Sequence, residues 1–134
     1  MTLVLDASAA LRAMGSTAAR NALAGFELIG PPLLLSEVTS ALHEALWRRQ
    51  ITEADANVHR AAFTSLAVDI VTPADLFEVA WTIATDLGLA KTYAAEYLAL
   101  ARLRRTRVLT TDARLRRGAA RTGLVMDPSE LDPG

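Results

Sequence analysis

Apolar positions along this chain fall into two alternating kinds of segment. Short apolar runs, typical of buried strands, occupy residues 2–6, 68–71, 107–111 and 124–126, and residues 26–29 are ambiguous. Longer segments with helical spacing occupy residues 7–14, 17–24, 32–49, 53–66, 72–88, 92–105 and the stretch after residue 112. Because strands alternate with helices, the pattern predicts an α/β fold with a mainly parallel sheet of four to five strands.

Residues at the predicted helix ends support these boundaries. Pro32 suits the first turn of a helix, where a missing amide hydrogen costs nothing. Thr52 and Asp55 have the spacing of a helix start in which each side chain caps the backbone amide of the other. Gly88 is a natural helix stop, since glycine adopts the left-handed conformation without strain.

Length and composition place the chain among small folded proteins. Its 134 residues, 51% of them hydrophobic, suffice for one domain, predicted over residues 1–126, with a loose tail over residues 127–134. The absence of cysteine excludes disulfides and zinc–thiolate sites. No apolar run has the roughly 20 residues that span a bilayer, and the first residues do not resemble a signal peptide. We therefore expect a cytoplasmic protein without membrane association.

Charge is distributed unevenly along the chain. The net charge is only −1, but the first 90 residues carry five basic and ten acidic residues, whereas residues 91–134 carry nine basic and five acidic ones. Eight arginines and a single acid, Asp112, lie between Arg102 and Arg121. One acid within an arginine-rich segment is an arrangement that suits an anionic substrate and a metal ion.

Three acids lie where a shared site can form. Asp6 and Asp112 each follow a predicted strand, and in open α/β sheets ligands bind beyond the carboxyl ends of the strands. Glu37 lies near the start of a predicted helix. Carboxylate oxygens are the ligands that Mg²⁺ and Mn²⁺ prefer, and a bound cation stabilises charge that develops on a phosphate. Acids beside arginines therefore favour metal-dependent cleavage of a phosphodiester.

Each acid also has an ordinary structural interpretation. Asp6 and Asp112 can serve simply as helix caps, and Glu37 is a helix-start acid that the helix dipole favours. For any one of these acids, the structural role is nearly as well supported as a role in a functional site. Only the combination, in this order along the chain, separates the two.

Four segments together resemble the PIN-domain ribonucleases, and most closely the VapC-type toxins of bacterial toxin–antitoxin pairs. The segments are Leu-Val-Leu-Asp-Ala-Ser-Ala (3–9), Pro-Pro-Leu-Leu-Leu-Ser-Glu-Val-Thr-Ser-Ala-Leu (31–42), Thr-Tyr-Ala-Ala-Glu-Tyr-Leu-Ala-Leu-Ala (92–101) and Leu-Thr-Thr-Asp-Ala-Arg-Leu (109–115). The resemblance extends to about residue 126. It implies a three-layer α/β/α fold and a Mg²⁺- or Mn²⁺-dependent endoribonuclease.

The resemblance assigns roles residue by residue. Asp6, Glu37 and Asp112 match the acids that hold the metal and catalyse the reaction in this family, and Ser8 and Thr110 match its supporting hydroxyls. The remaining acid of the family lies in a Tyr-Asp-Ala-x-Tyr motif.

In this chain the motif reads Tyr-Ala-Ala-Glu-Tyr, so Ala94 leaves a metal-ligand position vacant. A deliberate inactivating substitution and natural divergence both explain the alanine. Glu96 is expected to face away from the site, because residues two apart on a helix differ by about 200°. The resemblance therefore implies a protein that folds but cleaves RNA poorly.

The resemblance also implies partners. VapC-type toxins pair with a VapB-type antitoxin, act on structured RNA such as transfer RNA, and usually form homodimers. From their position after Asp112, we expect Arg114, Arg116 and Arg117 to contact RNA, although solvated helix faces are an equal alternative.

A second function, a non-catalytic RNA- or partner-binding module, would explain Ala94 as natural decay. Phosphatase and receiver functions are disfavoured, because the first needs an acid at position 8 and the second an acid at position 7. No glycine-rich phosphate loop is present.

Overall fold

The structure, a computed structural model that describes residues 1–131, is built on a sheet of five parallel strands in the order β3-β2-β1-β4-β5. The strands are β1 (Thr2–Leu5), β2 (Glu27–Gly30), β3 (Asp69–Ile70), β4 (Val108–Leu109) and β5 (Val125–Met126). The prediction of a mainly parallel sheet is confirmed, and the ambiguous segment 26–29 contributes β2. β4 is shorter than the run of apolar residues that predicted it.

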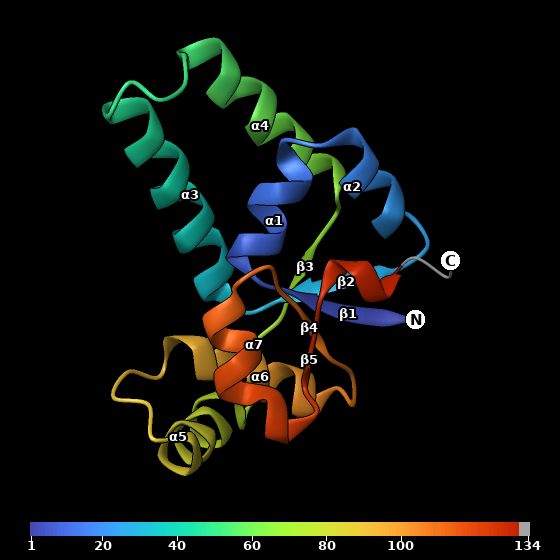
Figure 1. Cartoon of the computed structure of the whole chain (residues 1–134), viewed down its shortest axis with the longest axis vertical. Helices are drawn as coiled ribbons and strands as arrows, with labels where there is room; N and C mark the ends of the chain where they lie inside the picture. The colour runs from blue at the N-terminus through green and yellow to red at the C-terminus, as the bar shows by residue number, and fades with distance from the viewer. Residues whose placement is uncertain (132–134) are drawn as a thin grey trace.

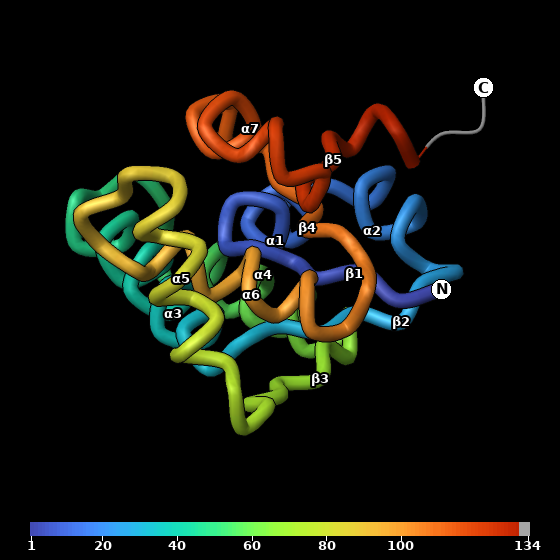
Figure 2. Tube along the Cα trace, turned by 90° about the horizontal axis from the view of Figure 1, so that it is seen from below, coloured from blue at the N-terminus to red at the C-terminus, as the bar shows by residue number. Residues whose placement is uncertain are grey.

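Seven α-helices cover the two faces of this sheet within the described residues (Figures 1 and 2). Helices α1 to α4 lie on one side, and α5 and α6 lie on the other, so the three-layer arrangement is as expected. Helix α7 packs beside β5. The bounds are α1 (Ala7–Met14), α2 (Thr17–Leu23), α3 (Pro32–Trp47), α4 (Glu53–Ser65), α5 (Leu76–Leu87), α6 (Tyr93–Leu103) and α7 (Ala113–Ala119).

The central strand β1 forms the middle of the core. Leu3, Val4 and Leu5 are at most 1% exposed, because helices cover both faces of the sheet. β1 pairs with β2 on one side and with β4 on the other, and the register places Leu5 opposite Leu109. The residues that follow these two strands are therefore neighbours at one edge of the sheet.

A glycine fixes the entry into α3. Gly30 ends β2, and a Cβ atom built there would lie 2.6 Å from Cδ2 of Leu34, which is closer than two carbon atoms can approach. Pro32 occupies the first turn of α3, as the sequence predicts. The close packing of Gly30 against Leu34 brings the start of α3, and with it Glu37, next to the carboxyl edge of the sheet.

The segment after β5 is more ordered than the predicted loose tail. Residues Pro128–Leu131 form a 3₁₀ helix, η2. Oδ1 of Asp127 accepts a hydrogen bond from the Ser129 amide (2.8 Å), and Oε2 of Glu130 accepts one from the Asp127 amide (2.7 Å). This reciprocal capping is a short-range signal that the sequence contains. The rest of the predicted tail, residues 132–134, lies outside the described residues.

None of the helices in residues 1–131 combines the length and hydropathy needed to cross a membrane.

Two aromatic side chains of α5 are exposed on the surface of the protein. Trp81 and Phe77 of α5 are 71% and 60% exposed, so they do not belong to the core.

Candidate active site

Asp6 lies at the carboxyl end of β1, where the strand passes directly into α1. Its Oδ1 atom accepts hydrogen bonds from the Ala9 amide (2.9 Å) and from the Ser8 hydroxyl (2.7 Å), so it caps the helix. Asp6 is only 5% exposed. Burial raises the pKa of Asp6 above its usual value, these hydrogen bonds oppose the increase, and the negative charge of Asp112 adds a smaller one.

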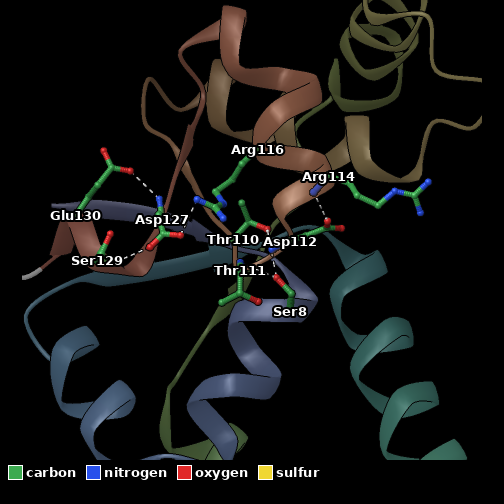
Figure 3. Close-up of polar contacts among 9 residues, drawn as sticks. All are labelled: Ser8, Thr110, Thr111, Asp112, Arg114, Arg116, Asp127, Ser129 and Glu130. Atoms are coloured by element: carbon green, nitrogen blue, oxygen red, sulfur yellow. Dashed lines mark hydrogen bonds and ion pairs between the residues drawn. The ribbon is translucent and has the colours of Figure 1, made fainter.

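Hydroxyl groups tie the ends of β1 and β4 together (Figure 3). The oxygen atoms of Ser8 and Thr110 lie 3.2 Å apart, although 102 positions separate the two residues in the sequence. Ser8 Oγ also accepts a hydrogen bond from the Thr111 amide (2.9 Å), and Thr110 Oγ1 accepts one from the Asp112 amide (3.0 Å). This network holds the backbone of Asp112 in a fixed position relative to Asp6.

Asp112 begins α7. Its Oδ1 atom accepts hydrogen bonds from the amides of Arg114 (2.9 Å) and Leu115 (3.3 Å), which makes Asp112 the cap of this helix. The residue is exposed, in contrast to Asp6. The charge of Asp112 contributes to the raised pKa of Asp6, so the two acids lie within electrostatic reach of each other. Asp6 and Asp112 both act as helix caps, and both lie at the carboxyl edge of the sheet, as the sequence predicts.

Glu37 reaches the site from α3 and is held by a tyrosine. The Tyr97 hydroxyl on α6 donates a hydrogen bond of 2.5 Å to Oε1 of Glu37. Tyr97 is 3% exposed, and burial together with the carboxylate of Glu37 raises its pKa, so the phenol keeps its proton and remains a donor. The charges of Asp6 and Glu96 raise the pKa of Tyr97 further.

Glu96 is buried on α6 rather than exposed on a solvent face of the helix. The residue is 9% exposed, and its pKa is raised by burial and by the negative charge of Glu37. The reason is that α6 packs against both α5 and β1, so residues 95–101 are all buried and the helix has no solvent face in this stretch. Ala94 is half-buried and offers no oxygen ligand.

These acids match a hard cation in donor type, since all their ligand atoms are oxygen. In the described part of the chain, however, no three histidine or acidic side chains converge closely enough to hold a metal ion. The charge of Asp112 contributes to the raised pKa of Asp6, and the charge of Glu37 contributes to the raised pKa of Glu96.

The arginines that follow Asp112 differ in their surroundings. Arg114 and Arg117 are exposed. Arg116 is half-buried and forms an ion pair with Asp127, with Nη1 2.9 Å from Oδ2. Its Nε atom is buried without a hydrogen-bond partner. The guanidinium group of Arg116 therefore joins α7 to the segment that leads into η2.

Sequence reasoning does not identify two side chains of this site. It assigns Tyr97 to packing, whereas the Tyr97 hydroxyl bonds to Glu37, and it expects Glu96 to face away from a buried site, whereas Glu96 is itself buried. The repeat of tyrosine at positions 93 and 97 carries no signal of its own, because the two side chains differ completely in burial: Tyr93 is 56% exposed and Tyr97 is 3% exposed. Only the placement of α3 against α6 distinguishes them.

The fold and this edge site define a family. The sequence profile of the PIN domain matches residues 3–120, and the chain belongs to the PIN-domain family. Over 114 residues, 84% of its length, the chain is 35% identical to a VapC ribonuclease of Mycobacterium bovis and to the ribonuclease VapC9 of Mycobacterium tuberculosis, covering 87% of each. The resemblance to VapC-type proteins is thereby confirmed.

Solved structures support the fold. The protein PAE2754 of Pyrobaculum aerophilum superimposes with a TM-score of 0.73 at 20% identity, covering 98% of this chain and 92% of that one. A chain of a toxin–antitoxin complex from Klebsiella pneumoniae superimposes with a TM-score of 0.63 at 17% identity, covering 94% and 97%. At these identities the likeness concerns the architecture alone.

Proposed function

We propose that this chain is the toxin of a toxin–antitoxin pair and an endoribonuclease that depends on Mg²⁺ or Mn²⁺. The observation that supports the proposal is the position of Asp6 and Asp112 directly after two paired parallel strands, with Glu37 on the helix that follows β2, in a chain similar to VapC ribonucleases. RNA is the substrate, with transfer RNA as the first class to test, and the protein acts in the cytoplasm.

In this proposal Asp6, Glu37 and Asp112 hold the metal ion. When bound, the metal would lower the pKa of a water molecule and stabilise negative charge on the scissile phosphate. Ser8 fixes the orientation of the Asp6 carboxylate, and Thr110 fixes the backbone of Asp112.

The exposed guanidinium groups of Arg114 and Arg117 lie directly after Asp112, where they can bind the RNA backbone on either side of the cleavage point. These contacts position the substrate and are independent of its base sequence.

Ala94 reduces the activity of this chain. Loss of one carboxylate ligand weakens metal binding, and even an indirect partner of a metal site is typically worth roughly 10–100-fold. The test is RNA cleavage with Mg²⁺ or Mn²⁺ by the chain and by Ala94→Asp. We expect the variant to show cleavage that EDTA abolishes and that exceeds that of the unmodified chain by at least about 10-fold.

Two results would count against this proposal. Near-equal cleavage by both proteins would show that position 94 is not a vacant ligand position. Absence of cleavage from both proteins on total cellular RNA would favour a non-catalytic binding module, for which Ala94 is the motivating observation.

A groove between α3 and α4 is the proposed site for a VapB-type antitoxin. It has a volume of about 440 Å³, and its apolar lining includes Leu35, Leu42, Leu46 and Phe63. An apolar helix or strand of the partner would fill it. The exposed Phe77 and Trp81 of α5 form a separate apolar surface, which we assign to a homodimer.

A further inference from the structure

A second polar cavity lies where the ends of three helices meet, and none of the acids of the candidate active site lines it. Its volume is about 470 Å³, and it is bordered by the last turns of α5, by the end of α6 and by η1, a 3₁₀ helix (Ala120–Thr122) that follows α7. The lining residues are Ile83, Asp86, Leu87, Arg102, Arg121 and Thr122. Two arginines face a single acid in this set, so the cavity carries a surplus of positive charge.

Arg121 is held at the cavity by the backbone of α5. Its Nη2 atom donates a hydrogen bond to the carbonyl oxygen of Asp86, in the last turn of that helix. A guanidinium group has five N–H donors, so most of them remain available for a ligand. Among residues 1–131 no acid forms an ion pair with Arg121, and its charge is therefore not neutralised by the protein.

Arg102 brings a second guanidinium group to the same cavity from the last turn of α6. It is exposed, and within the part of the chain that the structure describes it has no ion pair. Arg107 and Arg116, by contrast, pair with Glu130 and Asp127. Two unpaired positive charges at one cavity repel each other, and an anion between them would turn this repulsion into attraction.

The arginines of α7 connect this cavity with the carboxyl edge of the sheet. Arg114 and Arg117 are three positions apart on α7, so they share one face of the helix, and both are exposed. Figure 3 shows the side chain of Arg114 extending away from Arg116, which is engaged in its ion pair. Because η1 follows α7 directly, a series of arginines extends from Asp112 to Arg121, over a distance on the order of 13 Å.

We propose that this cavity is an anion-binding subsite in which Arg102 and Arg121 together hold one phosphate of an RNA backbone, remote from the point of cleavage. The inference rests on the proposed function, because it takes RNA as the ligand, and it adds a contact beyond Arg114 and Arg117. Hydrogen bonds from guanidinium groups to phosphate are strong and do not depend on the base sequence. The subsite therefore contributes affinity and sets the direction of the strand across α7.

Arg121 also has an ordinary structural role. Its bond to Asp86 places a cation at the carboxyl end of α5, where the helix dipole favours positive charge. This role requires neither Arg102 nor a ligand. Arg102→Gln is therefore the cleaner substitution, since it removes a charge from the cavity without removing the contact of Arg121 with the backbone of α5.

The test measures binding of a fluorescein-labelled single-stranded RNA to the full chain by fluorescence anisotropy, with EDTA present so that the RNA stays intact. Arg102→Gln and Arg121→Gln are compared with the unmodified chain, singly and together. Arg104→Gln is the matched control, because Arg104 is another exposed arginine at the end of α6 and does not line the cavity. Each titration is repeated at several salt concentrations, and melting temperatures report on the fold.

We expect each substitution in the cavity to weaken RNA binding by roughly 5- to 10-fold at low salt, and Arg104→Gln by less than about 2-fold. On single-stranded nucleic acid, each phosphate contact adds about 0.7 to the steepness of log K against log salt. If both arginines hold one phosphate, the double variant should reduce this steepness by about 0.7. A reduction of about 1.4 would mean two separate contacts and would contradict a shared phosphate.

Equal losses from Arg102→Gln and Arg104→Gln would indicate a diffuse basic surface and overturn the inference. Unchanged RNA binding by the double variant would overturn it as well. If calorimetry then shows that inorganic phosphate binds the unmodified chain but not the double variant, the cavity is a site for small anions and not for RNA.

These failures are distinguishable from failure of the proposed function. If Ala94→Asp cleaves RNA in an EDTA-sensitive way while the double variant binds RNA normally, the ribonuclease stands and the subsite does not. If RNA binding depends on both arginines while neither the original chain nor Ala94→Asp cleaves RNA, the subsite stands and the enzyme does not. Absence of RNA binding by the unmodified chain would remove the subsite.

Discussion

The two halves of the site are held in place by different means. The strand half consists of Asp6, Ser8, Thr110 and Asp112, and backbone amides and hydroxyls bond to its polar groups. The helix half consists of Glu37, Glu96 and Tyr97, and in it a single hydrogen bond between side chains joins α3 to α6. Both halves contain a buried acid with a raised pKa.

These bonds make the strand half of the site rigid, whereas the side chains of the helix half can change position. Amides of α1 and α7 fix the carboxylates of the strand half, and these bonds persist as long as the helices do. The glutamates of the helix half lie at the ends of longer side chains, so they can move when an ion arrives. We therefore expect substitutions in the strand half to remove activity outright, and those in the helix half to change affinity by degrees.

The largest effect is expected from Asp6→Asn in the Ala94→Asp background. Asparagine keeps an oxygen that caps α1 but loses the charge, so the fold should persist while RNA cleavage falls at least about 100-fold. Cleavage rates and melting temperatures of the two proteins provide the measurement. A variant that cleaves within about 3-fold of its parent would remove Asp6 from the metal site.

An intermediate effect is expected from Tyr97→Phe. Loss of the hydroxyl frees Glu37, so Mn²⁺ binding should weaken by roughly 10-fold, and the free energy of unfolding should fall by about 1 kcal/mol. Calorimetry and urea unfolding measure the two quantities. Tyr93→Phe is the matched control, one helical turn away and exposed, and it should change neither. Equal effects of the two substitutions would contradict the positioning role of Tyr97.

A smaller effect concerns pH in the absence of metal. The pKa values of Asp6 and Glu96 are raised, so at pH values above their usual 3.8 and 4.5 the folded protein retains protons that the unfolded chain has released. The free energy of unfolding should therefore fall as pH rises through the folded-state pKa values, and then become level. Urea unfolding with EDTA at several pH values tests this.

Single substitutions separate the contributions of the strand half and the helix half to this pH dependence. Glu96→Gln should remove the part contributed by the helix half, and Asp6→Asn the part contributed by the strand half. Identical pH profiles for the original chain and both variants would show that neither acid carries a raised pKa.

The smallest effect lies outside both halves. Arg116→Ala removes the ion pair with Asp127, so amide hydrogen exchange at Ser129 and Glu130 should become severalfold faster while Mn²⁺ binding stays unchanged. Arg117→Ala, at the next and exposed position, should leave this exchange unaffected. If Arg116→Ala weakened RNA binding as strongly as Arg114→Ala, the expectation of an RNA contact at Arg116 would be supported.

The strand half is predictable from the sequence because its information is local. An apolar run followed by an acid and a hydroxyl residue defines both the end of β1 and the position of Asp6, and a similar pattern defines β4 and Asp112. The parallel sheet then brings the two ends together without further information. The capping of η2 by Asp127 is equally local, and the sequence contains the residues that form it.

The helix half is not predictable in the same way. Whether Glu96 faces solvent or the site depends on how deeply α6 is buried between α5 and β1, and the spacing of residues on one helix does not contain that information. The partnership of Arg116 with Asp127 depends likewise on where the chain passes after β5. Contacts between two helices, and contacts made by the segment that follows β5, depend on tertiary packing.

The strand order has a consequence for the synthesis of this protein. β1 leaves the ribosome first, but its neighbour β4 and the carboxylate of Asp112 follow more than 100 residues later. The strand half therefore cannot assemble on a partly translated chain, however well its earlier helices have folded. The two strand ends of the candidate site therefore come together only when translation is almost complete.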